Sequence, residues 1–275
     1  MRKKLGWGLL ILTLLALICA AIAWRDTMRD PAIREIALVL PGEPGAAPVS
    51  IVLLSDIHVS GPDMPPERLA RIVAQVNALE PDVIMLAGDV VSDKRSATRH
   101  YSSAESVAPL RKLRARLGKV YVPGNHDHWR GLAEIRIELE HAGFTVVQNN
   151  AIVLGPLVIG GLDDDFTGHA DLPATLAAMD GLPGAPVLLS HSPDPFADLP
   201  PGQRLMLAGH THCGQIAWPW GGTPATMSRY GDRYACGVVR ENGNTLVVTA
   251  GLGTSVLPFR FLVPPDMWRV ELQGE

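Results

Sequence analysis

Five short apolar segments, each followed directly by a polar cluster, constrain the fold of this 275-residue chain more than any other feature of its sequence. Val, Leu and Ile dominate the segments and turn residues bound them, which predicts buried strands. The segments are residues 49–54, 83–87, 120–122, 187–189 and 205–208. Amphipathic helical patterns lie between them at 66–79, 106–117 and 132–142. This alternation predicts an α/β fold in which helices cover a sheet.

The second half of the chain carries strand-like segments with few helical patterns between them. These segments are residues 146–154, 157–162, 237–239, 245–249 and 268–272. They predict a second, mixed sheet, so that two sheets face each other with helices outside. Gly and Pro are dispersed as turn residues and no internal repeat occurs, which predicts a single domain over residues 33–273.

The polar clusters that end the five predicted strands all contain residue types that bind metal ions. Open α/β sheets hold their ligands at the carboxyl ends of strands, so clusters far apart in sequence converge there. The seven candidate ligands are Asp56, His58, Asp89, Asn125, His191, His210 and His212. A single Asp after a strand is more often a turn or capping residue than a metal ligand. The seven candidate ligands together, however, are more than one ion needs. Two divalent ions that share Asp89 would use them all.

The spacing within two of these clusters predicts how their side chains point. Asp56 and His58 are two residues apart, as are His210 and His212. In an extended backbone, residues at this spacing point to the same side of the strand. We therefore expect each pair to face one common site.

The first 24 residues predict a membrane anchor. Residues 5–24 form an unbroken run of 20 uncharged, mostly apolar residues, long enough to cross the roughly 30 Å hydrocarbon core of a bilayer. A basic flank at residues 1–4 precedes the run, and residues 25–32 are expected to form a linker. A signal peptide is the alternative, because residues 21–23 resemble a small-residue cleavage site. The shallow bias of positive charge favours a single-pass protein of the inner (plasma) membrane with its domain on the extracytoplasmic side.

The charge balance limits the class of partner, and the cysteines bear on the cellular compartment. The net charge is -4 for the whole chain and -7 without the first 24 residues, so we expect no nucleic-acid binding. Part of that acidity is metal-binding capacity, because two divalent ions beside Asp56 and Asp89 would make a locally negative site positive. For Cys213 and Cys236 we expect two free, buried thiols, with a disulfide as the alternative if the domain lies outside the cytoplasm.

The order of the clusters resembles the calcineurin-like metallophosphoesterase superfamily. The pattern is Asp-x-His, Gly-Asp, Gly-Asn-His-Asp, His and Gly-His-x-His, and it extends over residues 50–255. The predicted anchor and the segment at residues 251–260 are similar to a bacterial membrane-anchored subgroup. The resemblance implies a four-layered α-β-β-α sandwich with two mixed sheets. It also implies one ion on Asp56, His58 and His212, a second on Asn125, His191 and His210, and Asp89 as the bridge.

The resemblance implies a phosphoester hydrolase in which a hydroxide that bridges two ions attacks phosphorus. By the same resemblance, His126 contacts the phosphate and protonates the leaving group, and Asp127 orients the His126 imidazole. Without thiolate ligands, Mn²⁺ is the expected ion, with Fe, Zn²⁺ and Mg²⁺ as alternatives.

The substrate remains open at the level of sequence. We expect a monomer that cleaves a phosphodiester or pyrophosphate bond. Some relatives in the subgroup hydrolyse UDP-2,3-diacylglucosamine in lipid A biosynthesis, which makes a lipid-linked substrate one hypothesis. The alternatives are a general phosphodiesterase or phosphatase of the cell envelope and a nonenzymatic, metal-stabilised membrane scaffold. Candidate substrate-binding residues are Asp163, Asp164 and Arg260.

Aromatic residues gather late in the chain, after the candidate ligands. They are Trp218, Trp220, Phe259, Phe261 and Trp268. We expect them to pack in the core or between the sheets, and the alternative is an aromatic rim that touches lipid.

Overall fold

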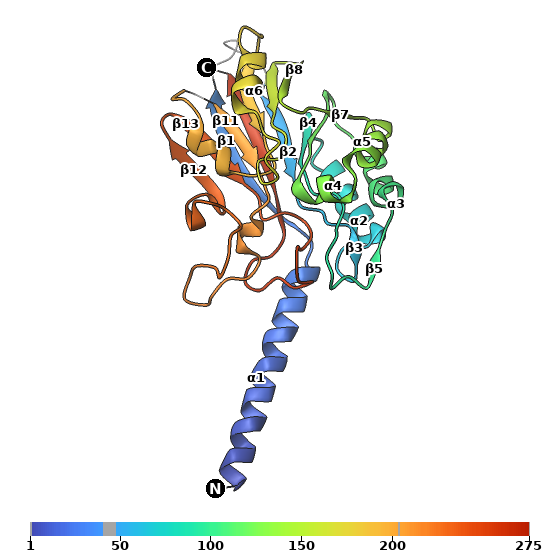
Figure 1. Cartoon of the computed structure of the whole chain (residues 1–275), viewed down its shortest axis with the longest axis vertical. Helices are drawn as coiled ribbons and strands as arrows, with labels where there is room; N and C mark the ends of the chain where they lie inside the picture. Colours follow the sequence, from blue (N-terminus) through green and yellow to red (C-terminus); the bar gives the residue numbers. More distant parts are fainter. Residues whose placement is uncertain (1, 41–47, 203, 275) are drawn as a thin grey trace.

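The computed structural model describes residues 2–40, 48–202 and 204–274, and two six-stranded mixed sheets form its centre (Figure 1). The first sheet has the order β1-β14-β2-β4-β6-β7, and only the β14–β2 pair is antiparallel. Its strands are β1 (Ala32–Leu40), β14 (Asp266–Gly274), β2 (Val49–Leu54), β4 (Val83–Ala87), β6 (Gly118–Val122) and β7 (Phe144–Val146).

The second sheet has the order β12-β13-β11-β10-β9-β8, with antiparallel pairs at its two edges and parallel pairs between them. Its strands are β12 (Gly237–Glu241), β13 (Asn244–Val248), β11 (Leu205–Ala208), β10 (Ala185–Leu189), β9 (Leu157–Gly161) and β8 (Asn150–Leu154). A small two-stranded sheet joins β3 (Ser60–Gly61) to β5 (Arg99–His100).

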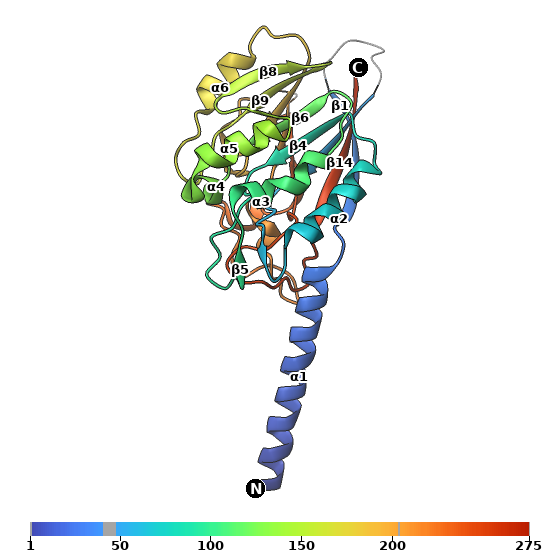
Figure 2. The same cartoon turned by 90° about the vertical axis from the view of Figure 1, so that its right-hand side faces the viewer.

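Alternation of side chains along the strands divides the core into layers. Ile51 and Leu53 of β2 pack between the two sheets, against residues such as Val187 of β10. Val52 and Leu54 point to the opposite face, where helices cover the first sheet. Figure 2 shows this outer layer, which consists of α2 (Pro66–Asn77), α3 (Ser103–Val107) and α5 (Leu132–His141). A thinner layer, with α6 (Leu172–Met179) and short 3₁₀ turns, covers the second sheet. The predicted fold, two mixed sheets enclosed by helices, is confirmed.

Several predicted elements differ from the observed ones for local reasons. The helix predicted over 106–117 is instead α3 and a 3₁₀ turn over Ala108–Lys112, with Pro109 at the start of the turn. A capping box between Ser102 and Glu105 starts α3 earlier than predicted. The strand predicted over 146–154 is interrupted between β7 and β8, where Asn149 has a positive φ of 48°. Neither β1 nor α6 was predicted.

The N-terminal helix α1 spans Arg2–Met28 and projects from the domain (Figure 1). Its segment Gly6–Met28 is long and apolar enough to cross a membrane. The predicted linker at 25–32 is not a linker, because α1 continues to Met28 and β1 begins at Ala32. Instead, the end of the helix docks on the domain, where Asp26 and Thr27 are buried. Met1 of the predicted basic flank lies outside the described residues.

The late aromatic residues divide into two groups. Trp268 is only 7% exposed and packs between the sheets, as expected for a core residue. The core prediction is wrong for Trp218, Trp220 and Phe259, which are all exposed, and Phe261 is half-buried. The loops that carry Trp218, Trp220, Phe259 and Phe261 lie where α1 joins the domain.

Candidate metal centre

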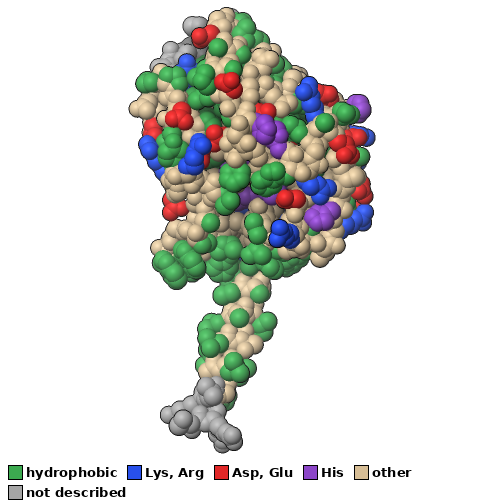
Figure 3. Space-filling view, in the orientation of Figure 1, with side chains coloured by type: hydrophobic (Ala, Val, Ile, Leu, Met, Phe, Trp, Pro, Cys, Tyr) green, Lys and Arg blue, Asp and Glu red, His purple; other side chains and the backbone are tan. Residues whose placement is uncertain are grey.

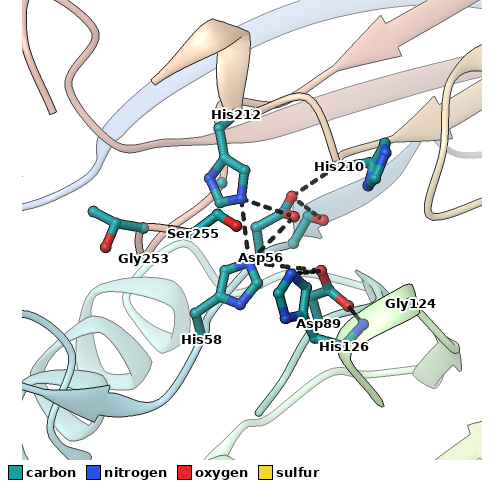
Figure 4. Close-up of polar contacts among 12 residues, drawn as sticks. Asp56, His58, Asp89, Gly124, His126, His210, His212, Gly253 and Ser255 are labelled. Carbon is teal, nitrogen blue, oxygen red and sulfur yellow. Dashed lines mark hydrogen bonds and ion pairs between the residues drawn. The ribbon is translucent and has the colours of Figure 1, made fainter. Parts of the chain in front are cut away.

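The carboxyl ends of five strands bring the seven candidate ligands into one buried cluster. Figure 4 shows five of them, namely Asp56, His58, Asp89, His210 and His212. Asp56 and His58 follow β2, Asp89 follows β4, and His191 follows β10. Asn125 follows β6 at the start of α4 (Asn125–Arg130), while His210 and His212 follow β11. The convergence expected from the strand ends is therefore present, and every one of the seven side chains is buried.

The backbone at these positions differs from the extended form that the spacing predicted. Asp56, His58, Asp89, His210 and His212 all have positive φ values, between 49° and 69°. In a residue other than glycine this conformation costs about 1–3 kcal/mol, and such conformations gather at functional sites. The side chains of each pair do reach a common site, but they do so from tight turns after the strand rather than from the strand itself.

Two glycines allow the strand ends to approach closely. A Cβ on Gly124 would overlap Oδ1 of Asp89, and one on Gly88 would lie 2.6 Å from Nδ1 of His191. Gly88 also has a positive φ of 75°. A larger residue at either position would displace a candidate ligand.

Asp56, His58 and His212 form the first group of donor atoms. The Nε2 atoms of His58 and His212 are 3.1 Å apart, and Oδ1 of Asp56 lies 3.4 Å from Nε2 of His212. That carboxylate oxygen is buried and accepts no hydrogen bond from any described residue, whereas Oδ2 accepts from the Ser55 hydroxyl and from the backbone N–H of His210. A buried carboxylate oxygen without a partner is costly, and a cation between these three side chains would satisfy it.

Asn125, His191 and His210 form the second group. Nε2 of His191 lies 3.1 Å from Oδ1 of Asn125 and 3.1 Å from Nδ1 of His210. The backbone fixes both rings, since Nδ1 of His191 donates to the carbonyl of Ala87 and Nε2 of His210 donates to the carbonyl of Met227. With those nitrogens protonated, the lone pairs of His191 Nε2 and His210 Nδ1 face each other and are available to a metal.

Asp89 lies between the two groups. Its Oδ2 is 3.6 Å from Nε2 of His58 and 3.2 Å from Nε2 of His191. Its Oδ1 accepts a hydrogen bond from the backbone N–H of His126, which fixes the orientation of the carboxylate. One carboxylate is thus within reach of cations bound by either group.

The electrostatics of the cluster favour the protonation states that bind metals at every titratable ligand except His191. Burial raises the pKa of Asp56, but the neighbouring imidazoles, His212 first, outweigh it and lower the pKa below its ordinary value. Burial lowers the pKa of His58, and burial together with the charge of His191 lowers that of His210 to about 4. Burial also disfavours the charged form of His191, but the surrounding carboxylates, Asp89 first, together outweigh it and raise the pKa. Ionised carboxylates and neutral imidazoles at His58, His210 and His212 suit a cation, whereas His191 would release a proton when a cation binds.

His126 lies at the edge of the cluster and faces a carboxylate that the sequence did not reveal. Its Nδ1 is hydrogen bonded to Oδ1 of Asp93, and its Nε2 lies 3.9 Å from Oδ2 of Asp89. Asp93 stands only four residues beyond Asp89, and this proximity to a candidate ligand was the only signal in the sequence.

The predicted role of Asp127 as the residue that orients His126 is wrong. Both Asp127 oxygens accept hydrogen bonds from elsewhere, namely the backbone N–H groups of Gly124 and residues 89–91 and the hydroxyl of Tyr121. Asp127 therefore holds together the loops after β4 and β6, and it reaches the site only through Asp89 and Asn125, which those loops carry.

We expect Asp93→Asn to lower the rate of any hydrolysis that this site supports by about tenfold to hundredfold, the usual loss when a carboxylate that orients a functional histidine is removed. The amide keeps the shape of the side chain but cannot stabilise a protonated imidazole. Steady-state kinetics should show the loss in kcat with little change in KM. Asp93→Glu should restore part of the activity, and equal activity of Asp93→Asn and the parent would contradict the role.

None of the three candidate substrate-binding residues lines the cavity next to the cluster. Asp163 is bound by His128 and Gln148, and Oδ2 of Asp164 accepts from Thr167. Arg260 is fully buried, and its guanidinium donates to the carbonyls of Ala250, Gly251 and Gly253. Oδ1 of Asp164 has no hydrogen-bond partner among the described residues, and the Arg260 guanidinium also lies 3.3 Å from Nδ1 of His212. Substrate binding by these three residues stays a prediction, which the lining of this cavity does not support.

A cavity of about 310 Å³ leads from the cluster to the protein surface. Asp89, Asn125 and His126 lie at its inner end together with His210 and His212. Its remaining walls are largely apolar, and they include Trp129, Phe166, Ile216, Met227, Val256 and Leu257. The cavity offers a polar, cation-binding end and an apolar approach to it.

Cys213 and Cys236 form a disulfide, so the expectation of two free thiols is wrong. Their Cα atoms are 4.8 Å apart although 23 positions separate them in sequence. Sequence could not reveal this proximity, which arises because the turn after β11 packs against the segment that leads into β12. The disulfide fixes the residue next to His212.

Removal of the disulfide should lower the free energy of unfolding by about 3 kcal/mol, as expected for a closed loop of this length. The double variant Cys213→Ala with Cys236→Ala would be compared with the parent by urea unfolding of the full chain in detergent, followed by near-UV circular dichroism. Cys19→Ala is the matched control, because Cys19 is an exposed, unpaired cysteine in α1. A loss no greater than that of the control would contradict the prediction.

Buried Asp, Asn and His side chains gathered at the strand ends of a two-sheet α/β fold are typical of a metal-binding α/β protein. A sequence model of the calcineurin-like phosphoesterase family matches residues 49–214, which contain every candidate ligand. The chain belongs to this family and is therefore a phosphoester hydrolase, and the His/Asp clusters support divalent metal ions.

Curated relatives agree with this membership. An uncharacterized metallophosphoesterase of Bacillus subtilis, YkuE, is 34% identical over 227 residues, which are 79% of this chain and 76% of the relative. A transmembrane protein with a metallophosphoesterase domain from Danio rerio is 32% identical, and the match covers 81% of this chain but only 53% of that protein. Among solved structures, a 5'-nucleotidase precursor from Thermus thermophilus aligns with 82% of this chain and 54% of its own, at 16% identity and a TM-score of 0.49.

Proposed function

We propose that this chain is a membrane-anchored, dinuclear phosphoesterase that cleaves a phosphodiester or pyrophosphate bond. Asp56, His58 and His212 would hold one divalent ion, Asn125, His191 and His210 would hold a second, and Asp89 would bridge them. The position of Asp89 Oδ2 between His58 and His191 carries the proposal. Two bound ions would supply a hydroxide nucleophile at neutral pH and neutralise the charge of the phosphate oxygens.

The chain's own residues would handle the proton of the leaving group. The Nδ1–H of His126 donates to Asp93, which leaves Nε2 directed toward Asp89 and the cavity. From this position Nε2 can deliver a proton to the leaving oxygen, while Asp93 stabilises the imidazolium before transfer. His126 is then the catalytic acid and Asp93 a positioning residue.

Mn²⁺ is the ion that we propose, with Fe, Zn²⁺ and Mg²⁺ as alternatives to be compared directly. The proposed ligands are imidazoles, carboxylates and one amide, and none is a thiolate. Such a mixed nitrogen and oxygen set suits borderline and hard divalent ions.

We propose that residues 5–24 anchor the chain in the inner (plasma) membrane, behind the basic flank at residues 1–4, and that residues 33–273 form a monomeric catalytic domain on the extracytoplasmic side. The apolar span of α1 supports an anchor, and relatives from Danio rerio and Bos taurus are named transmembrane proteins. The Cys213–Cys236 disulfide supports the oxidising side of the membrane.

For the substrate we propose a lipid-linked phosphoester of the cell envelope. The apolar walls of the cavity support an apolar group beside the phosphate. UDP-2,3-diacylglucosamine, the lipid A precursor, is the alternative within this class, but it is made on the cytoplasmic side, and the disulfide argues against that side. The position of the His126 ring beside Asp89 and His58 favours an enzyme over a metal-stabilised scaffold.

A substrate screen of the full chain in detergent, stripped of metal by chelation and reloaded, tests the proposed function. Mn²⁺-loaded protein should bind about two ions per chain and hydrolyse bis(p-nitrophenyl) phosphate, and the stripped protein should not. Lipid phosphodiesters, lipid pyrophosphates, nucleotide-sugar lipids and soluble nucleotides would then be compared by product analysis. If none of these compounds were hydrolysed in a metal-dependent reaction, the proposal would be refuted.

A further inference from the structure

The exposed apolar side chains of two loops gather at one end of the domain, beside the point where α1 leaves it. One loop follows β11 and the other connects β13 to β14. The six side chains, which we call the apolar loop face, are Trp218, Trp220, Val256, Leu257, Phe259 and Leu262. Figure 3 shows hydrophobic side chains clustered at this end of the domain, next to the helix. Trp220 and Val256 are 80% and 74% exposed, which is unusual for large apolar residues.

The same two loops are almost without charge. Residues 213–228 contain no charged residue, and residues 250–265 contain only Arg260, which is fully buried. In a chain in which 19% of residues are charged, about six would be expected over these 32 positions. An exposed surface that is both apolar and uncharged is typical of a site that contacts a membrane or another protein.

Hydrogen bonds hold the two loops together as one surface. Ala217 N–H donates to the carbonyl of Phe261, and Phe261 N–H donates to the carbonyl of Gln215. The Gln215 side chain bonds both Leu257 and Ser255. The rings of Trp218 and Trp220 stack 5.5 Å apart and nearly parallel. The apolar loop face is therefore a built surface rather than a set of separate side chains.

The end of α1 fixes the level of this surface relative to the membrane. The Leu262 N–H donates to the carboxylate of Asp26, and the Arg260 N–H donates to the hydroxyl of Thr27. The uncharged run at residues 5–24 ends at Trp24. Asp26 lies two positions further on, which is about 3 Å along the helix axis. A bilayer that α1 crosses would thus end at the level of the apolar loop face.

We propose that the apolar loop face is a membrane-binding surface that holds the domain against the bilayer crossed by α1. Indole rings prefer the interface between headgroups and acyl chains, and apolar loop residues there are removed from water. The occupant is the lipid surface, because the direct contact with α1 places that surface beside these loops.

This surface also explains where the cavity opens. Val256 and Leu257 belong to the apolar loop face and line the cavity that ends at His126. If the proposed function holds, on which this consequence rests, a phosphoester in the headgroup layer can reach the site while its apolar part stays next to lipid. Soluble phosphoesters would have to enter through a mouth that the membrane partly covers.

Depth-dependent fluorescence quenching tests the membrane-binding surface without any use of activity. Full-length protein in vesicles of phosphatidylcholine and phosphatidylglycerol would carry a bimane label at Trp220→Cys or Val256→Cys, in a Cys19→Ala background and without reductant. Val153→Cys is the control, because Val153 is an exposed valine of β8, and β8 lies at the end of the domain remote from α1 (Figure 1).

Lipid-attached quenchers should quench the label at positions 220 and 256 at least about three times as strongly as the label at position 153. Aqueous iodide should quench the label at position 153 more strongly than the other two. Equal lipid quenching at all three positions would overturn the proposal. So would a label shielded from both quenchers, which would indicate a protein partner or a second copy instead. The two test positions lie on different loops, so misfolding of one variant leaves the other decisive. An inactive protein with this quenching pattern would refute only the proposed function.

Discussion

Replacement of Asp89 by Asn should abolish most of the hydrolytic activity and at the same time lower the number of bound ions. Asp89 is the carboxylate within reach of both donor groups, and Asn offers neither its charge nor a second oxygen. The loss in kcat/KM should be at least about a hundredfold. That is the upper end of the loss seen when a group that only orients a metal ligand is removed. Hydrolysis of bis(p-nitrophenyl) phosphate and metal content by mass spectrometry measure the two effects on one sample.

The matched control is Asp198→Asn, which makes the same chemical change at an exposed aspartate outside the cluster. It should leave both rate and metal content unchanged. If Asp89→Asn kept two ions per chain and lost less than about tenfold in activity, the bridging role would be excluded. A variant that kept its ions but lost its activity would instead assign Asp89 to the orientation of His126, because Oδ1 of Asp89 accepts a hydrogen bond from the backbone N–H of His126.

Sequence was sufficient to predict where the candidate ligands converge. Strands 49–54, 83–87 and 205–208 agree with β2, β4 and β11 at both ends, because apolar runs bounded by turn residues leave little freedom in register. Once the strands are known, their carboxyl ends define the place where Asp56, Asp89 and His210 meet. The local geometry could not be derived in this way, because the left-handed turns at these residues depend on tertiary contacts.

The partner of His126 shows why side-chain roles are harder to predict than positions. Both Asp127 and Asp93 lie close to a candidate ligand in sequence. Asp127 is the third residue of α4, so its side chain turns back to the helix start and accepts the N–H of Gly124. Asp93 reaches the imidazole from another loop, and no spacing rule encodes that contact. The disulfide and the junction of α1 with the domain depend in the same way on contacts between distant segments.

Replacement of His126 by Ala should slow hydrolysis by about 10²–10⁴ for substrates with poor leaving groups, the usual contribution of a general acid. An alkoxide cannot leave without a proton, whereas p-nitrophenolate can. The loss should therefore be much smaller for p-nitrophenyl esters than for alkyl phosphodiesters, and a plot of rate against leaving-group pKa should become steeper. Metal content should stay at the parent value, because His126 is not among the proposed ligands.

This separation of effects distinguishes the acid from the metal site. Asp89→Asn should lower metal content and slow all substrates alike, while His126→Ala should spare the ions and discriminate between leaving groups. His141→Ala, at an exposed position on α5, is the matched control for loss of an imidazole. A uniform loss of less than about tenfold across leaving groups would remove His126 from proton transfer. The contact with Asp93 would then serve only to hold the loop after β4 against α4.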